Sequence, residues 1–156
     1  MKKTAVALSF LLTCSATGAF AMGGDPLPEP TKSKTPHASS EEVYNHGLAL
    51  AESGDFMGAE RLYREAIAID PKLPEAWNGL GHALKKQKRY DEALAAYDEA
   101  LTLRPGFPLA MQYLGELYVE TGQIDKARAL LAKLRPLDQK NADRLAMAIH
   151  AGTANW

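Results

Sequence analysis

Cysteine is almost absent from this chain of 156 residues, and the only one, Cys14, lies close to the N-terminus. A single cysteine forms no intramolecular disulfide and no C-x-x-C pair, so noncovalent packing must hold the fold together. G-x-S-x-G, P-loop and H-E-x-x-H motifs are also missing. No pair of histidines has metal-ligand spacing on one helix face. These absences predict a protein that is not an enzyme and that needs neither a metal nor another cofactor.

An excess of one charge is missing as well. The sequence has 18 basic and 19 acidic residues, and this balance gives no support for a nucleic-acid partner. The one strongly apolar run is N-terminal, where Lys2 and Lys3 precede TAVALSFLL and the small-residue site Ala19-Phe20-Ala21 follows. The run is too short to span a membrane as a stable anchor. Its order is typical of a secretory signal peptide over residues 1–21.

We therefore predict cleavage after Ala21 and a periplasmic or secreted protein. Loss of two lysines would leave 16 basic and 19 acidic residues, a net charge of −3. An alternative stays open, because LLTCS resembles a bacterial lipoprotein signal in which Cys14 would be acylated. Such signals usually place glycine, alanine or serine before the cysteine, whereas this chain has Thr13. The alternative predicts an outer-membrane lipoprotein that assists pilus or secretion assembly.

Residues 22–39, MGGDPLPEPTKSKTPHAS, contain four prolines, two glycines and no aromatic residue. Such a segment cannot bury enough apolar surface to offset the entropy lost on ordering. We predict a disordered linker there, with His37 solvated.

From Ser40 onward the sequence repeats every 34 residues. The register is visible in two columns of small residues and one of prolines: Gly47, Gly81 and Gly115; Ala59, Ala93 and Ala127; Pro71 and Pro105. The middle copy adds Trp77, Leu80, Tyr97 and Ala100. This period and pattern resemble the tetratricopeptide (TPR) signature W-x2-L-G-x2-Y…A-x3-F…P. The resemblance covers about three quarters of the chain and is that of an exported bacterial TPR protein.

The resemblance implies an all-α fold, a right-handed α-solenoid of three TPR helix pairs with a C-terminal capping helix. We expect repeats over 40–73, 74–107 and 108–137, a cap over 138–151 and a loose tail over 152–156. Helices are expected near 41–53, 56–69, 75–87, 90–103, 109–121 and 124–134. Asp138 is the expected N-cap of the seventh helix, and Gly152 its expected end.

Two glycines within the helix WNGLGHAL need an explanation, because each costs about 1 kcal/mol relative to alanine. We expect Gly81 to lie where its helix closely approaches Ala93 of the partner helix. No common contact explains Gly79, whose aligned residues are Asn45 and Tyr113. His46 takes the place of the core residues Leu80 and Leu114, so we expect it to be partly buried.

In TPR proteins the first helix of each pair lines a concave groove. The resemblance therefore implies a peptide-binding groove formed by Tyr44, Asn78, His82, Lys85, Gln112 and Glu116. Chaperone-binding TPR domains hold a C-terminal carboxylate with Lys, Asn and Arg at positions that match Tyr44, Leu48, Gly79, Leu109 and Tyr113. None of these residues has the clamp chemistry, so an acidic C-terminus is not the expected ligand.

The predicted function is that of a non-catalytic protein–protein interaction module or scaffold in the bacterial periplasm. Its partner would be a protein or peptide, as a groove of this kind accommodates an extended segment or a helix. Assembly of envelope machinery is the setting that the resemblance suggests. Self-association by stacking of the open ends is a further expectation.

Overall fold

The computed structural model describes residues 38–154, and every regular element within this range is an α-helix. The helices are α1 (Ser40–Ser53), α2 (Phe56–Ile69), α3 (Pro74–Lys86), α4 (Tyr90–Leu103), α5 (Pro108–Glu120), α6 (Ile124–Leu134) and α7 (Gln139–Ala154). The predicted signal peptide, most of the predicted linker with His37, the alternative lipid site Cys14 and the terminal Trp156 lie outside the described residues.

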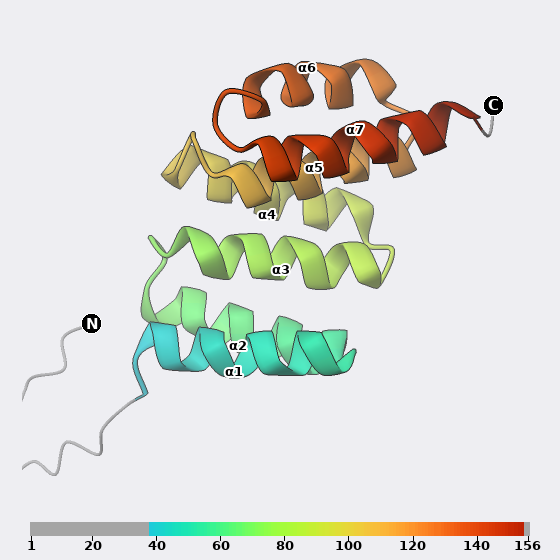
Figure 1. Cartoon of the computed structure of the whole chain (residues 1–156). Coiled ribbons are helices and arrows are strands. Elements are labelled where there is room, and N and C mark those ends of the chain that lie inside the picture. The colour runs from blue at the N-terminus through green and yellow to red at the C-terminus, as the bar shows by residue number, and fades with distance from the viewer. Residues whose placement is uncertain (1–37, 155–156) are drawn as a thin grey trace, which may run out of the picture. The chain divides into compact units, whose positions relative to one another are not determined.

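The first six helices form three antiparallel pairs that stack in chain order. Helix α1 packs on α2, α3 on α4 and α5 on α6, while α2 also contacts α3, and α4 contacts α5. Figure 1 shows the pairs rising as layers from α1 and α2 to α5 and α6. Helix α7 packs against both α5 and α6 and covers the open end of the third pair. This is the all-α solenoid with a C-terminal cap that the repeat pattern predicts.

Helix starts are set by local capping. Ser39 and Glu42 form a capping box on α1, in which each side chain accepts a hydrogen bond from the other residue's backbone N–H. Pro74 and Pro108 occupy the first turns of α3 and α5. These helices begin one residue earlier than predicted, because proline at the first helical position is already in a helical conformation. Asp138 caps α7 as predicted, accepting from the Asn141 backbone N–H at 3.0 Å.

The turns inside the three helix pairs share a left-handed residue. Gly54 and Gly122 have φ values of 90° and 75°, which confirms their predicted role at helix ends. The aligned residue in the middle pair is Lys88, which adopts a φ of 63°. A side chain in this region costs roughly 1–2 kcal/mol, so the middle turn is strained where the others are not.

The repeated glycines lie under large side chains of the core. A Cβ on Gly47 would lie 2.9 Å from Cε1 of Tyr63, and one on Gly81 would lie 2.7 Å from Cε1 of Tyr97. The repeated alanines Ala59, Ala93 and Ala127 are fully buried. Gly81 is therefore required by helix packing, as predicted, but the atoms that crowd it belong to the Tyr97 ring rather than to Ala93.

Two details of the prediction were wrong. His46 is exposed, because α1 is the first helix of the described residues, and within them no helix covers the face that buries Leu80 on α3. Gly152 does not end α7, which continues to Ala154. A Cβ on Gly152 would collide with Cγ1 of Val119, so this glycine permits close packing of α7 within the helix.

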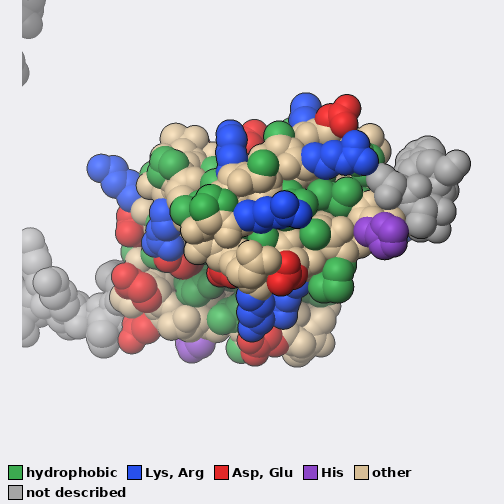
Figure 2. Space-filling model, turned by 45° about the horizontal axis from the view of Figure 1, so that its top comes forward, with side chains coloured by type: hydrophobic (Ala, Val, Ile, Leu, Met, Phe, Trp, Pro, Cys, Tyr) green, Lys and Arg blue, Asp and Glu red, His purple; other side chains and the backbone are tan. Residues whose placement is uncertain are grey.

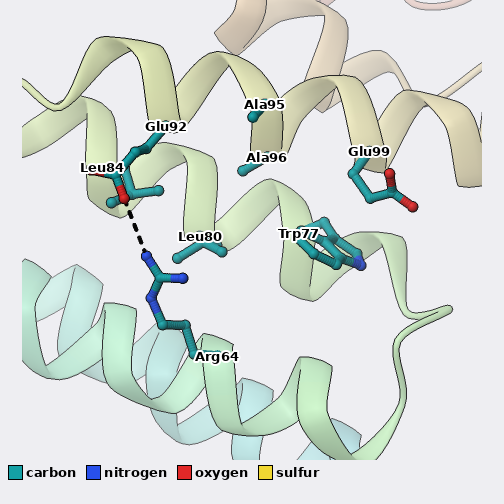
Figure 3. Close-up of a pocket in the computed structure, with 8 residues that line it drawn as sticks. All are labelled: Arg64, Trp77, Leu80, Leu84, Glu92, Ala95, Ala96 and Glu99. Atoms are coloured by element: carbon teal, nitrogen blue, oxygen red, sulfur yellow. Dashed lines mark ion pairs between the residues drawn. The ribbon is translucent and has the colours of Figure 1, made fainter.

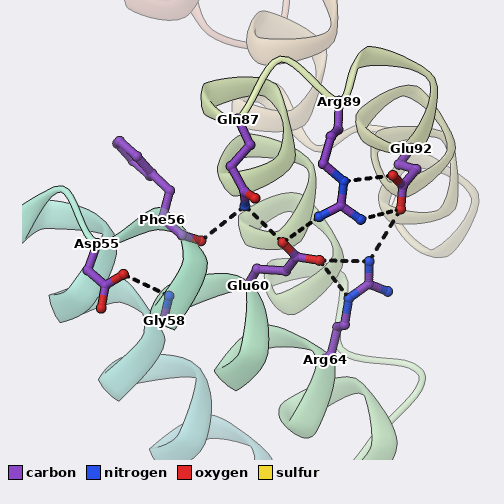
Figure 4. A network of polar contacts seen from close by, with 8 residues as sticks. All are labelled: Asp55, Phe56, Gly58, Glu60, Arg64, Gln87, Arg89 and Glu92. Atoms are coloured by element: carbon purple, nitrogen blue, oxygen red, sulfur yellow. Dashed lines mark hydrogen bonds and ion pairs between the residues drawn. The ribbon is translucent and has the colours of Figure 1, made fainter.

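A polar network joins the first repeat to the second (Figure 4). Glu60 of α2 accepts hydrogen bonds from Gln87 at 2.8 Å and from Arg89 at 2.7 Å, both in the turn before α4. Arg64 donates to the same carboxylate at 3.0 Å. Burial alone would raise the pKa of Glu60, but these hydrogen bonds outweigh burial and lower it. The repeats are thus held together by charge as well as by the apolar core.

Charged side chains of both signs are mixed over the face of the solenoid seen in Figure 2, without a large patch of one sign. Within residues 38–154, no helix has both the length and the apolar character needed to cross a membrane.

Candidate functional site

A cavity of about 230 Å³ opens on the side of the solenoid formed by α1, α3 and α5. We call it the inner pocket. It is lined by Tyr44, Leu48, Ala51, Glu52, Tyr63, Asn78, Gly79, His82, Leu109 and Tyr113. Three predicted groove residues, Tyr44, Asn78 and His82, meet here although they come from two different repeats.

Aromatic rings form much of the wall. The rings of Tyr44 and Tyr63 are 5.7 Å apart between centroids. His82 stacks on Tyr113 at 4.9 Å and meets the edge of Phe56 at 5.9 Å. Burial, followed by the nearby charges of Lys86 and Lys85, lowers the pKa of His82 to about 4. The imidazole is therefore neutral at pH 7 and acts as a flat, weakly polar surface.

Asn78 places an unsatisfied acceptor at the pocket. The residue is only 4% exposed, and its Oδ1 has no hydrogen-bond partner among the described residues. A buried polar group without a partner costs about 1–3 kcal/mol. A ligand with an N–H donor would remove this cost, so the atom is suited to recognition.

Gly79 is explained by a contact between repeats. A Cβ there would lie 2.7 Å from Cζ of Tyr63, and Tyr63 belongs to the helix that precedes α3. The period alone could not reveal this, because the residues aligned with Gly79 are not small. The glycine keeps the Tyr63 ring inside and leaves the α3 side of the pocket open.

The other three predicted groove residues are bound to one another. Lys85 forms ion pairs with Glu116 at 2.9 Å and Glu120 at 3.2 Å, and its side chain is 5% exposed. Gln112 donates to Glu116 at 2.7 Å and is itself buried. We call Lys85, Gln112, Glu116 and Glu120 the inner ion cluster. In this structure the cluster joins α3 to α5, and direct ligand contact by its members stays a prediction.

All five positions that carry the clamp in chaperone-binding TPR domains line the inner pocket, namely Tyr44, Leu48, Gly79, Leu109 and Tyr113. In this chain the same place is aromatic and aliphatic. Glu52 is the only carboxylic acid in the lining, which contains no lysine or arginine. Sequence reasoning identified these positions but did not predict that they would form a pocket of their own.

A second, larger cavity of about 370 Å³ lies where α2, α3 and α4 meet. Figure 3 shows Trp77, Leu80 and Ala96 around it and Arg64 reaching Glu92 across its mouth. That ion pair measures 3.6 Å. The indole Nε1 of Trp77 donates to the Pro71 carbonyl at 2.8 Å, so its polar atom is already satisfied. This outer furrow is formed by framework residues of the repeat, and the inner pocket is the better candidate.

Comparison with known proteins agrees with the architecture. Two family models, each described as tetratricopeptide repeat, match residues 44–108 and 84–150. The TPR repeat-containing thioredoxin TTL4 of Arabidopsis thaliana is 29% identical over 120 residues, which is 74% of this chain and 18% of that protein. The Drosophila melanogaster protein O-mannosyl-transferase Tmtc2 is 45% identical over 56 residues, 36% of this chain and 6% of that protein. The chain thus spans less than a fifth of either relative.

Solved structures match over most of the helical part. The TPR2B domain of yeast Sti1 aligns with a TM-score of 0.69 at 20% identity, covering 75% of this chain and 98% of that one. The Yersinia enterocolitica type III secretion chaperone SycD, in complex with a peptide of the translocator YopD, aligns with a TM-score of 0.66 at 17% identity, covering 74% and 92%. These likenesses establish the fold. With the 34-residue period and the two family matches, they show that the chain belongs to the tetratricopeptide repeat family, whose fold supports protein–protein interaction.

Proposed function

We propose that this protein is a non-catalytic module that binds an extended peptide or helix of a protein partner in its inner pocket. The observation that carries the proposal is the unpaired, buried Oδ1 of Asn78 beside an aromatic wall. Apolar surface with a few oriented polar atoms is the usual composition of a recognition site.

Related structures support binding on this scaffold. SycD was solved with a peptide of the translocator YopD, and the second TPR of RPAP3 with the HSP90 peptide SRMEEVD. Both scaffolds resemble this one over more than 60% of the chain. Because identity is low, the likeness supports the general mode of binding and does not name a partner.

The proposed setting is the bacterial periplasm, where the module would serve as a scaffold or envelope assembly factor. The proposal is based on residues 1–21, whose two lysines, apolar core and A-x-A site have the order typical of a secretory signal. Intact mass spectrometry of the exported protein tests this directly. A chain that starts at Met22 supports a periplasmic or secreted protein, whereas a lipid adduct on Cys14 would instead establish the lipoprotein.

The binding proposal is tested by affinity capture from an envelope extract. The wild type is compared with a Tyr44→Ala/His82→Ala variant, and with Glu99→Gln in the outer furrow as the matched control. Circular dichroism melts verify that each variant is folded. We expect the Tyr44→Ala/His82→Ala variant, called the inner variant, to capture no partners and the Glu99→Gln control to capture them as the wild type does. Equal recovery by all three proteins would show that the inner pocket is not the binding site.

Self-association is the other partner hypothesis, since α1 contacts only α2 and α3 among the described helices and a second copy could stack on that end of the array. Light scattering of the purified protein across a range of concentrations measures it. A mass that rises with concentration supports stacking, and a constant monomer mass excludes it.

A further inference from the structure

We infer that the inner pocket selects an apolar side chain flanked by a basic residue, and rejects the acidic chain end that chaperone-binding TPR domains hold. The inference rests on the proposed function, because it specifies the ligand of the same pocket. Size, hydrogen bonding and charge lead to it separately.

The size of the inner pocket fits one large side chain. An apolar cavity of about 150 Å³ holds a benzene ring, and this one measures about 230 Å³. Its walls at Tyr44 and Tyr113 offer ring faces and edges, which attract aromatic partners beyond the gain from buried area. Leu48 and Leu109 add aliphatic surface. A phenylalanine, leucine or methionine side chain would therefore be buried favourably.

The hydrogen-bonding requirement points to peptide backbone. Asn78 Oδ1 is an acceptor, so the ligand must present a donor, and a main-chain N–H next to the anchoring side chain supplies one. A carboxylate has no hydrogen to donate. It would therefore leave Asn78 Oδ1 without a partner, and at this residue it could accept only from the side-chain amide N–H.

Charge also disfavours a ligand carboxylate. Glu52 lines the pocket, and no salt bridge or hydrogen bond to its carboxylate is found among the described residues. Lys85 is neutralised by Glu116 and Glu120, while Lys86 is exposed and outside the lining. A ligand lysine or arginine would pair with the exposed carboxylate of Glu52, whereas an acidic end would lie beside this like charge with no lysine or arginine in the lining.

A random heptapeptide display library, selected on the full-length mature protein, tests the inference. Selected peptides should carry an aromatic or large aliphatic residue, with lysine and arginine outnumbering aspartate and glutamate. By fluorescence anisotropy, a selected peptide should bind about tenfold more tightly than its lysine-to-glutamate version and than SRMEEVD, as expected for like-charge apposition. Glu52→Gln should remove the charge preference and keep the apolar one.

The opposite change, Leu109→Lys, introduces a cation at one of the clamp positions, which is half-buried near the start of α5. It should weaken the selected peptide and strengthen SRMEEVD. Peptides that bind in a Tyr44-dependent manner but favour acidic ends would overturn the ligand chemistry and leave the proposed function intact. Absence of any selected peptide, together with equal partner capture by wild type and the inner variant, would overturn both.

Discussion

Replacing Gly81 with alanine should destabilise the protein, although alanine is the better helix former. The added Cβ would lie 2.7 Å from Cε1 and 2.8 Å from Cδ1 of Tyr97. Ordinary contact begins near 3.4 Å, so the ring must retreat by about 0.7 Å. Tyr97 is fully buried, and the Tyr113 ring lies 6.3 Å away between centroids, which leaves little room for that movement.

The magnitude follows from two opposing contributions. Alanine gains about 1 kcal/mol in helix propensity, whereas overpacking a filled core typically costs about 1–3 kcal/mol. We expect a net loss of about 1 kcal/mol, which corresponds to a fall of roughly 3–6 °C in Tm for a domain of this size. Urea titration and calorimetry measure both quantities.

A double-mutant cycle with Tyr97→Leu isolates the cause. If the ring is responsible, Gly81→Ala should stabilise the Tyr97→Leu background by up to about 1 kcal/mol, because only the propensity gain remains. Gly106→Ala is the control, since its added Cβ meets nothing within 4 Å and the change should be neutral or slightly stabilising. A raised Tm for Gly81→Ala, or additive effects in the cycle, would refute the argument.

Four further changes have predicted outcomes. Glu60→Gln should lower the free energy of unfolding at pH 7 and make it depend less on acid. The native pKa of Glu60 is lowered, so the stabilisation by its carboxylate is present above the unfolded pKa of 4.5 and is lost as pH falls through the native pKa. Thermal melts from pH 7 to 3 measure this. His82 has a native pKa of about 4 and an unfolded pKa of 6.5, so protonation favours the unfolded state as pH falls from 6.5 to 4, by up to about 3 kcal/mol. His82→Gln should remove this pH dependence of the free energy of unfolding. His46→Gln, at an exposed position, should leave it in place. Lys88→Gly should raise the free energy of unfolding by about 1 kcal/mol, because glycine removes the strain of the positive φ. Lys72→Gly should give no such gain, and urea titration measures both. Leu145→Ala removes a fully buried side chain of α7 and should cost about 2–5 kcal/mol and expose α7 to limited proteolysis, whereas exposed Met147→Ala should be nearly neutral.

The helical framework was predictable because its determinants are local and recur. Small residues at fixed positions, prolines after helices and left-handed glycines in turns each have a physical meaning that a 34-residue period exposes. The short α6 also follows from one residue, Pro136, since the helix ends at Leu134. Predicted helix ends differ from the structure by one residue at several termini, where capping decides the boundary.

The candidate site was predictable only in part, because its contacts cross between repeats. Tyr44, Asn78 and His82 line the inner pocket as predicted positions of the groove, but the pairing of Lys85 with Glu116 depends on how far apart α3 and α5 lie. The period reports which residues are equivalent and not how far one repeat lies from the next. Likewise, His46 was expected to be partly buried, because the period does not show that α1 lacks a neighbour on one side among the described residues.

The inner pocket exists because equivalent positions of the second and third repeats carry residues of very different size, Gly79 and Tyr113. At the first junction the Tyr63 ring lies on Gly79, so the α3 wall recedes. At the second junction the equivalent residue is Tyr113, and its ring meets Tyr97 while covering His82. The α3 wall is therefore recessed and the α5 wall projects, which opens the inner pocket between two repeats whose backbones are nearly equivalent. A symmetric groove would need the same residue at both positions, so the asymmetry itself argues for one anchoring side chain rather than a repeated contact.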